Sequence, residues 1–404
     1  MNYDGIVIGG GPAGLFAAIT AAQNGSRVLL LERNDRLGKK LLITGKGRCN
    51  VTNNCDGQEI LRNIPRNGRF LYSALDAMPP QKVMDFFESH GCPLKTERGN
   101  RVFPVSDKAQ SVLDCLKNEL RRLHVTLRTG RVQEILTENG QVSGVRTESE
   151  QYSANWVILA TGGLSYPTTG STGDGFAMAK ALGHTVTPTE GNLVPLETAG
   201  SDCQDMQGLS LRNVGVKLLN EKGKVLYKDF GELLFTHFGV SGPTVLSGSC
   251  HLKGACRLIL DLKPALDEGK LDARILRDLE MYQNRSMENA LTDLLPRSMI
   301  PVVLRRLEID ADMQANSLTK QKRRALVELL KAFPIEITGK RPVSEAIITY
   351  GGIKVSEIDP KTMGSKLVPG LYFAGEIIDC DAYTGGFNLQ IAWATAYAAG
   401  MAVK

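Results

Sequence analysis

The chain has 404 residues, more than a single hydrophobic core usually holds, so two or three domains are expected. Lys and Arg number 48 against 43 Asp and Glu, an excess too small to indicate a nucleic-acid partner. No apolar run is long enough to span a bilayer, and the first one lacks the basic start of a secretory signal. The eight cysteines are scattered without metal-ligand spacing, so we expect a cytoplasmic protein with reduced thiols, no metal and no membrane partner.

The chain opens with a strand, a glycine loop and a helix, the pattern of a nucleotide-binding βαβ unit. Gly9-x-Gly11-x-x-Gly14 follows an apolar strand and precedes a helix expected from Leu15 to Asn24. The glycines allow a tight turn, close approach of a pyrophosphate and close packing of helix on strand, while the helix N-terminus attracts phosphate. Glu32 ends the next apolar run, where its carboxylate can accept hydrogen bonds from a ribose. These features predict a dinucleotide site.

A loop rich in glycine and basic residues follows, from Leu37 to Asn53. One interpretation is a solvated, charged loop. The other is a loop that folds over the cofactor and neutralises its diphosphate, or holds an anionic substrate. The sequence leaves both open for the basic run, which consists of Arg33, Arg36, Lys39, Lys40, Lys46 and Arg48.

The middle of the chain predicts a nucleotide domain interrupted by an insertion. Helical patterns occur at 80–90 and 108–123, alternating segments at 125–136 and 142–147, and a buried strand at 156–160 that ends in Thr-Gly-Gly. Short β-type runs begin near residue 191, and residues 266–332 have a helical pattern. We therefore expect an FAD-binding domain (1–190 and 342–404), an inserted β-barrel domain (191–265 and 333–341) and a helical insert (266–332).

A second glycine motif lies near the C-terminus. Gly370–Glu376 has the pattern of a buried strand ending in glycine and acid, and a glycine pair then precedes an apolar helix expected from Leu389 to Ala399. The carboxylate of Glu376 suits the ribityl chain of FAD because it can accept two hydroxyl hydrogens, and a helix N-terminus favours an anionic flavin. Together the two ends predict FAD rather than NAD as the resident cofactor. A plain buried strand before a core helix is the alternative.

With these motifs in view, the chain resembles the BaiN-type (YhiN-like) family of NAD(P)/FAD-dependent oxidoreductases over nearly its whole length. The most specific segments are Gly-Arg-Cys-Asn at 47–50 and Thr-Gly-Gly-Phe-Asn-Leu-Gln at 384–390. The resemblance implies an α/β fold: an FAD-binding Rossmann-like domain of the two-dinucleotide-binding type, with inserted β-barrel and helical subdomains.

The resemblance also implies which residues bind FAD. Those expected at its ADP half are Gly9, Gly11, Pro12, Ala13, Gly14 and Glu32, with Val132 as a backbone partner of adenine. Those expected to line the flavin cleft are Lys39, Arg48, Cys49, Asn50, Thr161 and Gly162. Those expected at the ribityl chain and the pyrimidine side are Glu376, Gly386, Asn388 and Leu389. Further expected cofactor-binding residues are Arg33, Gly38, Ala160 and Gly375.

The redox step belongs to the flavin, so the protein needs to supply at most a proton donor. His237 is the first candidate because an imidazole suits proton transfer near neutral pH, although it could instead cap its turn. Tyr383, beside the flavin-binding turn, could donate a proton or simply pack. No second strand-glycine-helix unit for NADPH is found, so NAD(P)H or another electron carrier is expected as a transient donor.

Family membership leaves the reaction open, because members are reported both as reductases of carbon–carbon double bonds in steroid-like substrates and as oxidases of aminoacetone. The first hypothesis is an FAD-dependent oxidoreductase that reduces the double bond of a small steroid-like or enone substrate. The second is an oxidase of small amines. The third is an RNA-modifying or regulatory flavoprotein, against which the modest positive charge and the absence of a basic patch interleaved with aromatic residues both count.

Overall fold

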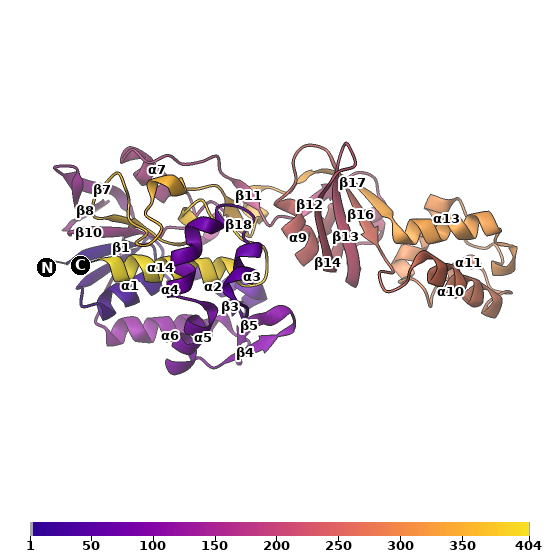
Figure 1. The fold of residues 1–404 in the computed structure, drawn as a ribbon, viewed down its shortest axis with the longest axis horizontal. Helices are drawn as coiled ribbons and strands as arrows, with labels where there is room; N and C mark the ends of the chain where they lie inside the picture. Colours follow the sequence, from indigo (N-terminus) through magenta and orange to yellow (C-terminus); the bar gives the residue numbers. More distant parts are fainter. Residues whose placement is uncertain (1–2, 404) are drawn as a thin grey trace. The chain divides into compact units, whose positions relative to one another are not determined.

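A computed structural model describes residues 3–403, and the contacts among them divide the chain into two compact units. The first unit comprises the residues up to Asn192 and those from Val343 onward, and the second comprises Leu193–Pro342. The second unit is therefore an insertion in the sequence of the first (Figure 1). The further division into separate barrel and helical domains stays a prediction.

The first unit is built on a five-stranded parallel sheet with the order β19-β10-β1-β2-β6. Its central strands are continuous apolar runs buried along their length, as expected for a parallel sheet covered on both faces. In this order β19, from the C-terminal part of the chain, pairs with β10, which comes from the part before the insertion. The strands are β1 Gly5–Ile8, β2 Val28–Glu32, β6 Thr126–Thr129, β10 Trp156–Leu159 and β19 Leu371–Phe373.

Helices α1 and α14 pack against each other and join the two ends of the chain. Small residues make this possible: a Cβ on Gly400 would lie 2.7 Å from the Thr20 Cβ. The other helices of the unit cover the sheet and its loops (Figure 1). The helices are α1 Pro12–Gln23, α2 Lys39–Ile43, α3 Gly57–Arg62, α4 Tyr72–Ala77, α5 Pro80–Ser89, α6 Ala109–Arg122, α7 Asp174–Ala181 and α14 Phe387–Ala402.

Three small antiparallel sheets complete the first unit, with the orders β3-β5-β4, β7-β8-β9 and β11-β18. The alternating run expected at 125–136 is not one strand, because it changes sheets at Gly130: β6 joins the parallel sheet and β7 joins an antiparallel one. The strands are β3 Thr52–Asn53, β4 Leu94–Glu97, β5 Arg101–Pro104, β7 Val132–Glu138, β8 Gln141–Thr147, β9 Gln151–Ser153, β11 Glu190–Asn192 and β18 Ile348–Tyr350.

The second unit contains a closed antiparallel barrel of order β12-β15-β14-β13-β16-β17. Alternate residues of β13 and β16 point into it, so Val214, Val216, Leu258 and Leu260 are buried. The strands are β12 Leu196–Thr198, β13 Ser210–Asn220, β14 Val225–Thr236, β15 Gly239–Ser241, β16 Cys256–Asp261 and β17 Phe333–Lys340. The helices are α8 Asp202–Asp205, α9 Pro243–Ser249, α10 Glu268–Met281, α11 Met287–Ala290, α12 Ile300–Leu307 and α13 Lys320–Lys331.

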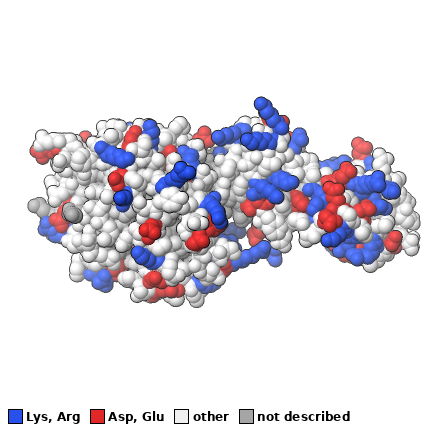
Figure 2. Space-filling model, viewed as in Figure 1, with Lys and Arg blue, Asp and Glu red and all other residues white. Residues whose placement is uncertain are grey.

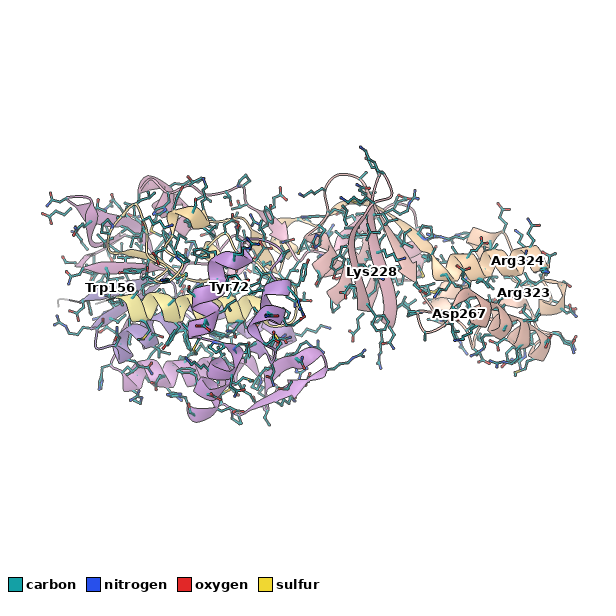
Figure 3. The ribbon with its side chains drawn as sticks, viewed as in Figure 1. Tyr72, Trp156, Lys228, Asp267, Arg323 and Arg324 are labelled. Atoms are coloured by element: carbon teal, nitrogen blue, oxygen red, sulfur yellow. The ribbon has the colours of Figure 1, made fainter. Side chains whose placement is uncertain are left out.

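The predicted fold class, an α/β Rossmann-like domain with an inserted barrel and helices, agrees with this topology. On the face shown in Figure 2, basic and acidic side chains are interspersed. Figure 3 marks Trp156 in the parallel sheet, where its ring packs on Gly5, and Lys228 on the barrel. Within residues 3–403 no helix is both long enough and apolar enough to cross a bilayer.

Candidate functional site

The first glycine loop connects β1 to α1, and each of its three motif glycines meets a different constraint. Gly9 has φ +108°, and a Cβ there would lie 2.5 Å from the Ala160 carbonyl oxygen. A Cβ on Gly14 would lie 1.8 Å from the Gly9 carbonyl oxygen, so the helix packs directly on the loop. Gly11 differs, because a Cβ there meets no protein atom within 4 Å. Only Gly11 therefore faces open space that a ligand can approach.

The N-terminus of α1 adds hydrogen-bond donors to this open space. Pro12, the first residue of the helix, has no N–H. No side chain caps the helix at Gly11, so the N–H groups that follow in the first turn are available to a ligand. Gly38 closes the far side of the loop: its N–H donates to the Gly10 carbonyl at 2.8 Å, and its φ of +68° suits glycine. The result is a backbone cradle of the kind that binds a phosphate or pyrophosphate.

Glu32 lies at the end of β2, beside this cradle. Its Oε2 accepts the Gly10 N–H at 2.6 Å, and its Oε1 accepts the backbone and side-chain N–H groups of Asn34 at 2.8 and 2.7 Å. These bonds fix the carboxylate and leave Oε2 an acceptor site for a ribose hydroxyl. The Gly130 N–H donates to the Glu32 carbonyl at 2.8 Å, which brings the start of β7 alongside.

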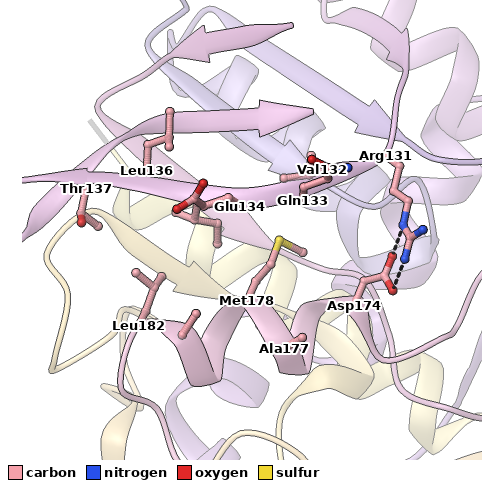
Figure 4. A pocket seen from close by; sticks show the side chains of 12 residues that line it. Arg131, Val132, Gln133, Glu134, Leu136, Thr137, Asp174, Ala177, Met178 and Leu182 are labelled. Carbon is pink, nitrogen blue, oxygen red and sulfur yellow. Dashed lines mark hydrogen bonds and ion pairs between the residues drawn. The ribbon is translucent and has the colours of Figure 1, made fainter. Parts of the chain in front are cut away.

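A cavity of about 550 Å³ lies between β7 and α7, with Val132, the expected adenine partner, in its wall (Figure 4). At its edge Arg131 pairs with both carboxylate oxygens of Asp174, at 2.9 and 3.1 Å. Arg33 reaches the same carboxylate at 3.0 Å. Burial raises the pKa of Asp174, but Arg131, Thr172 and Arg33 outweigh it and hold that pKa below its usual value. The predicted residue Arg33 therefore braces the loops at this end.

The second glycine motif places Glu376 on the other side of the first loop. Gly375 has φ +77°, and a Cβ there would lie 2.6 Å from the Cβ of Ala13, so the two predicted residues are in contact. The Gly375 N–H donates to Thr395 Oγ1 at 2.9 Å, which ties the motif to α14. The first glycine loop and the Gly375 motif are therefore in direct contact, and their joint binding of one cofactor stays a prediction.

Glu376 is held by a polar cluster that the sequence did not single out. Lys40 Nζ lies 2.5 Å from its Oε2, while Ser165 Oγ and the Thr349 N–H donate to its Oε1 at 2.8 Å each. Burial raises the pKa of Glu376, but Lys40 and the two donors outweigh it and keep that pKa below its usual value. The neighbouring predicted residue Lys39 pairs instead with Asp35 at 2.9 Å.

The signal for Lys40 is present in the sequence, but it is incomplete. Two adjacent lysines follow Gly38, and neighbouring residues of a helix differ by about 100° in direction, so only one of them can face the cleft. Which one does so depends on how α2 is oriented. The sequence alone does not determine this orientation.

The turn before α14, where the flavin is predicted to bind, lies on the loop that contains Asn50. Gly386 has φ +99°, and a Cβ there would lie 2.4 Å from the Thr52 carbonyl and 2.9 Å from Asn50 Oδ1. Asn388 braces the turn, because its side chain bonds to the backbone N–H and carbonyl of Ala382 at 2.9 and 2.8 Å. Leu389 follows in the first turn of α14, half-buried.

Two buried side-chain oxygens beside these turns have no hydrogen-bond partner among the described residues: Asn50 Oδ1 and Thr161 Oγ1. Buried polar atoms are rarely left unpaired. Thr161 lies at the end of β10, where Gly162 has φ +72°. The two orphan oxygens and the open space at Gly11 are what a polar, phosphate-bearing cofactor would fill, so the residues fit FAD.

Arg48 and Cys49, both predicted for the flavin cleft, have other partners in the structure. Arg48 pairs with Glu97 and with Asp107, and its guanidinium lies 4.1 Å from the centre of the Phe103 ring. Cys49 is fully buried, and burial raises its pKa to about 12. Its thiol is therefore protonated at neutral pH, which disfavours a redox role. Their contact with FAD stays a prediction.

The two predicted proton donors lie in different units. Tyr383 is half-buried in the turn before α14, and its N–H donates to the Asn63 carbonyl at 2.9 Å. His237 lies between β14 and β15 of the second unit, exposed, with its ring against that of Phe238. Both roles stay predictions, and the geometry supports Tyr383 more directly because it is adjacent to the turn.

Comparison with known proteins agrees with this geometry. The family described as HI0933-like protein Rossmann domain matches residues 3–402. The chain belongs to this family. The predicted resemblance to BaiN-type (YhiN-like) proteins is thereby confirmed, and the HI0933-like chain is an FAD-dependent oxidoreductase.

Two relatives match this HI0933-like chain over nearly their full lengths. A 3-dehydro-bile acid delta(4,6)-reductase of Clostridium scindens is 33% identical over 100% of this chain and 99% of its own. A ribosomal RNA dihydrouridine synthase of Escherichia coli is 31% identical over 98% and 97%. The solved 3-ketosteroid delta1-dehydrogenase of Sterolibacterium denitrificans has the same fold, with a TM-score of 0.54 at 14% identity over 99% and 98% of the two chains.

Proposed function

We propose that this protein reduces a carbon–carbon double bond that is conjugated to a carbonyl group. One observation carries the proposal: two full-length relatives of nearly equal identity are named for that chemistry on very different molecules. A 3-dehydro-bile acid with delta(4,6) unsaturation has its double bonds conjugated to the 3-keto group. Dihydrouridine is uridine whose C5–C6 double bond, conjugated to the C4 carbonyl, has been reduced. The functional group is shared, although the rest of the substrate is not.

When bound, FAD supplies the hydride that adds to the carbon β to the carbonyl. The remaining work is for the protein: it must hold the substrate in place, stabilise negative charge on the carbonyl oxygen and supply a proton to the α carbon. Tyr383 is suited to the last task because its phenol belongs to the turn that Asn388 braces. No side chain caps the start of α14, so its first backbone N–H groups favour negative charge beside that turn.

A steroid-like or other small enone is the first substrate candidate, in keeping with the bile-acid reductase. Uridine within RNA is the second, favoured by the full-length similarity to the dihydrouridine synthase. The expectation that nucleic acid is not a partner rested on the small net charge and on the absence of a basic patch interleaved with aromatic residues in the sequence, and it stays untested. Oxidation of small amines is the third candidate.

The deciding experiment uses the purified holoenzyme without oxygen, with NADH or NADPH as electron donor. We expect a 3-keto-4,6-diene steroid or a uridine-rich RNA to be converted to a product two mass units heavier, as expected for the addition of two hydrogens. Aminoacetone under air serves as the contrasting substrate. Peroxide release with aminoacetone, together with no reduction of either unsaturated substrate, would overturn the proposal.

Replacing Tyr383 with Phe separates proton donation from packing. We expect turnover to fall about 100-fold, within the usual range for general acid catalysis, while the KM changes little. His237→Asn is the parallel variant for the other candidate donor. If turnover by both variants equals that of the wild type, neither side chain donates the proton.

A further inference from the structure

The outer face of the barrel carries two lysines that lie directly opposite each other. Lys217 on β13 and Lys228 on β14 are Cα partners in the antiparallel ladder, so their side chains project from the same face of the sheet. Both are exposed, and neither has a carboxylate partner among the described ion pairs. Like charges in this arrangement are destabilising, so the structure maintains a small repulsion here.

The neighbouring positions on this face do not neutralise the two lysines. The row continues through Ile259 of β16 to Pro334 of β17, both uncharged. In the adjacent rows, Asp261 is paired with Lys331 at 2.7 Å, and Glu336 is paired with Arg257 at 2.5 Å. Asp229, between Lys228 and Phe230, is the Cα partner of the buried Val216, so it projects from the other face, where it accepts from Tyr227 Oη at 2.7 Å. Along β14, Glu232 is exposed on the same face as Lys228, four residues beyond it. The lysine pair therefore remains a local positive site.

An exposed aromatic ring lies beside the lysine pair. Phe230 is two residues from Lys228 on the same strand, so its ring projects from the same face, and 53% of the residue is exposed. Its cross-strand partner is Gly215, which has no side chain to cover the ring. A large apolar ring left open beside paired cations is suited to stacking on a flat, charged partner.

Further basic residues extend the positive charge along the same hairpin. Lys222 and Lys224 are exposed at the turn between β13 and β14, and Arg212 is exposed near the start of β13. Glu221 at the turn offsets part of this charge. We call the surface formed by Lys217, Lys228 and Phe230, with these flanking basic residues, the barrel basic face.

We propose that the barrel basic face binds single-stranded RNA. Lys217 and Lys228 contact backbone phosphates, and Phe230 stacks on a base, the combination by which proteins bind single strands without reading their sequence. The proposal rests on the RNA form of the proposed function. An acidic peptide would satisfy the lysines but would leave Phe230 without a planar partner, so RNA fits the face better.

The test measures binding of a fluorescent oligouridylate of about 12 nucleotides, the length scale of such sites, to the holoenzyme over a range of salt concentrations. For wild type we expect the logarithm of the binding constant to fall linearly with the logarithm of salt concentration. In Lys217→Ala/Lys228→Ala the magnitude of the slope should fall by about 1.4, because each lost phosphate contact on a single strand contributes about 0.7. Phe230→Ala should weaken binding about tenfold with the slope unchanged.

Lys217→Glu distinguishes a loss of RNA binding from a loss of folding. It replaces the repulsion with a cross-strand attraction to Lys228, so the protein should be at least as stable as wild type while RNA binding weakens. Lys320→Ala and Lys361→Ala are matched controls, because both lysines are exposed outside the barrel strands and neither side chain has a hydrogen-bond or ion-pair partner among the described residues. Both controls should bind RNA as wild type does.

Failure of the surface and failure of the proposed function give different results. Absence of oligouridylate binding by wild type at low salt, or equal binding by wild type and the lysine variants, would overturn the barrel basic face as an RNA site. RNA binding that depends on the lysines, without formation of dihydrouridine in the bound RNA, would support the barrel basic face as an RNA site and would exclude uridine reduction as the activity. Lysine-dependent binding to phosphatidylserine vesicles without RNA binding would also overturn the proposal.

Discussion

Replacing Gly11 with Ala should separate cofactor binding from folding, because only this motif glycine faces open space. The backbone at Gly11 has φ −81° and ψ −178°, which any residue adopts, and the added Cβ meets no protein atom within 4 Å. Replacing glycine with alanine at a helix N-cap lowers the free energy of unfolding by about 1 kcal/mol. Because alanine also restricts the unfolded chain, it raises that free energy by about 0.4–1 kcal/mol. The apoprotein should therefore unfold within about 1 kcal/mol of wild type.

The same methyl group occupies the space where the pyrophosphate is expected. Displacing one charge-assisted hydrogen bond costs about 1.5–3 kcal/mol, which corresponds to a rise in the Kd for FAD of about 10- to 150-fold. Gly14→Ala is the contrast, because its Cβ would lie 1.8 Å from the Gly9 carbonyl oxygen, and we expect a loss of about 3 kcal/mol in stability.

The assays are urea unfolding of both apoproteins and titration of each with FAD, followed by quenching of flavin fluorescence. Unfolding is measured without FAD because bound cofactor stabilises the folded state in proportion to its affinity. Wild-type affinity for FAD in Gly11→Ala, or equal destabilisation of the two variants, would refute the assignment of the pyrophosphate to Gly11.

Three further variants test the cleft and its surroundings. Lys40→Met should cost about 1–3 kcal/mol of unfolding free energy because it leaves the 22%-exposed Glu376 carboxylate without its cation, and adding Glu376→Gln should restore most of the loss. Burial raises the pKa of Asp381 in the folded state, so the folded protein binds this proton more tightly than the unfolded chain does. The protein therefore loses stability as the pH rises above about 4. Urea unfolding over that pH range should show Asp381→Asn gaining stability relative to wild type. Cys49, whose pKa is raised to about 12 by burial, should resist alkylation in the native protein at about pH 8 and react after unfolding, as peptide mass mapping can show; rapid native labelling would contradict its buried, protonated state.

Sequence patterns predicted the features that depend on residues close together in the chain. The turn at Gly9 and the acid at the end of β2 follow from the short-range geometry of a βαβ unit, so they could be derived from the first residues of the chain. The break at Gly130 was missed because both halves of the run alternate in the same way. Only pairing with β2 on one side and β8 on the other distinguishes them.

Side-chain partners that are distant in sequence could not be predicted in this way. Lys40 and Glu376 are 336 residues apart, and their contact depends on the placement of α2 against the parallel sheet. The acids that engage Arg48 come from β4 and from the loop after β5, a small sheet that the sequence patterns did not indicate. Residue types and motifs therefore predict where a binding site lies, but they do not predict which charged side chains pair with one another there.

The two ends of the chain are packed against each other through small residues. A Cβ on Gly375 would lie 2.6 Å from the Cβ of Ala13, and one on Gly400 would lie 2.9 Å from the Ala17 carbonyl oxygen, so each contact holds α1 close to the C-terminal segment. The loop where we expect the pyrophosphate and the turn where we expect the flavin are consequently joined by one packed core. Any change that separates α14 from α1 should weaken FAD binding at both ends together, even though neither Gly400 nor Ala17 belongs to the cradle or to the turn.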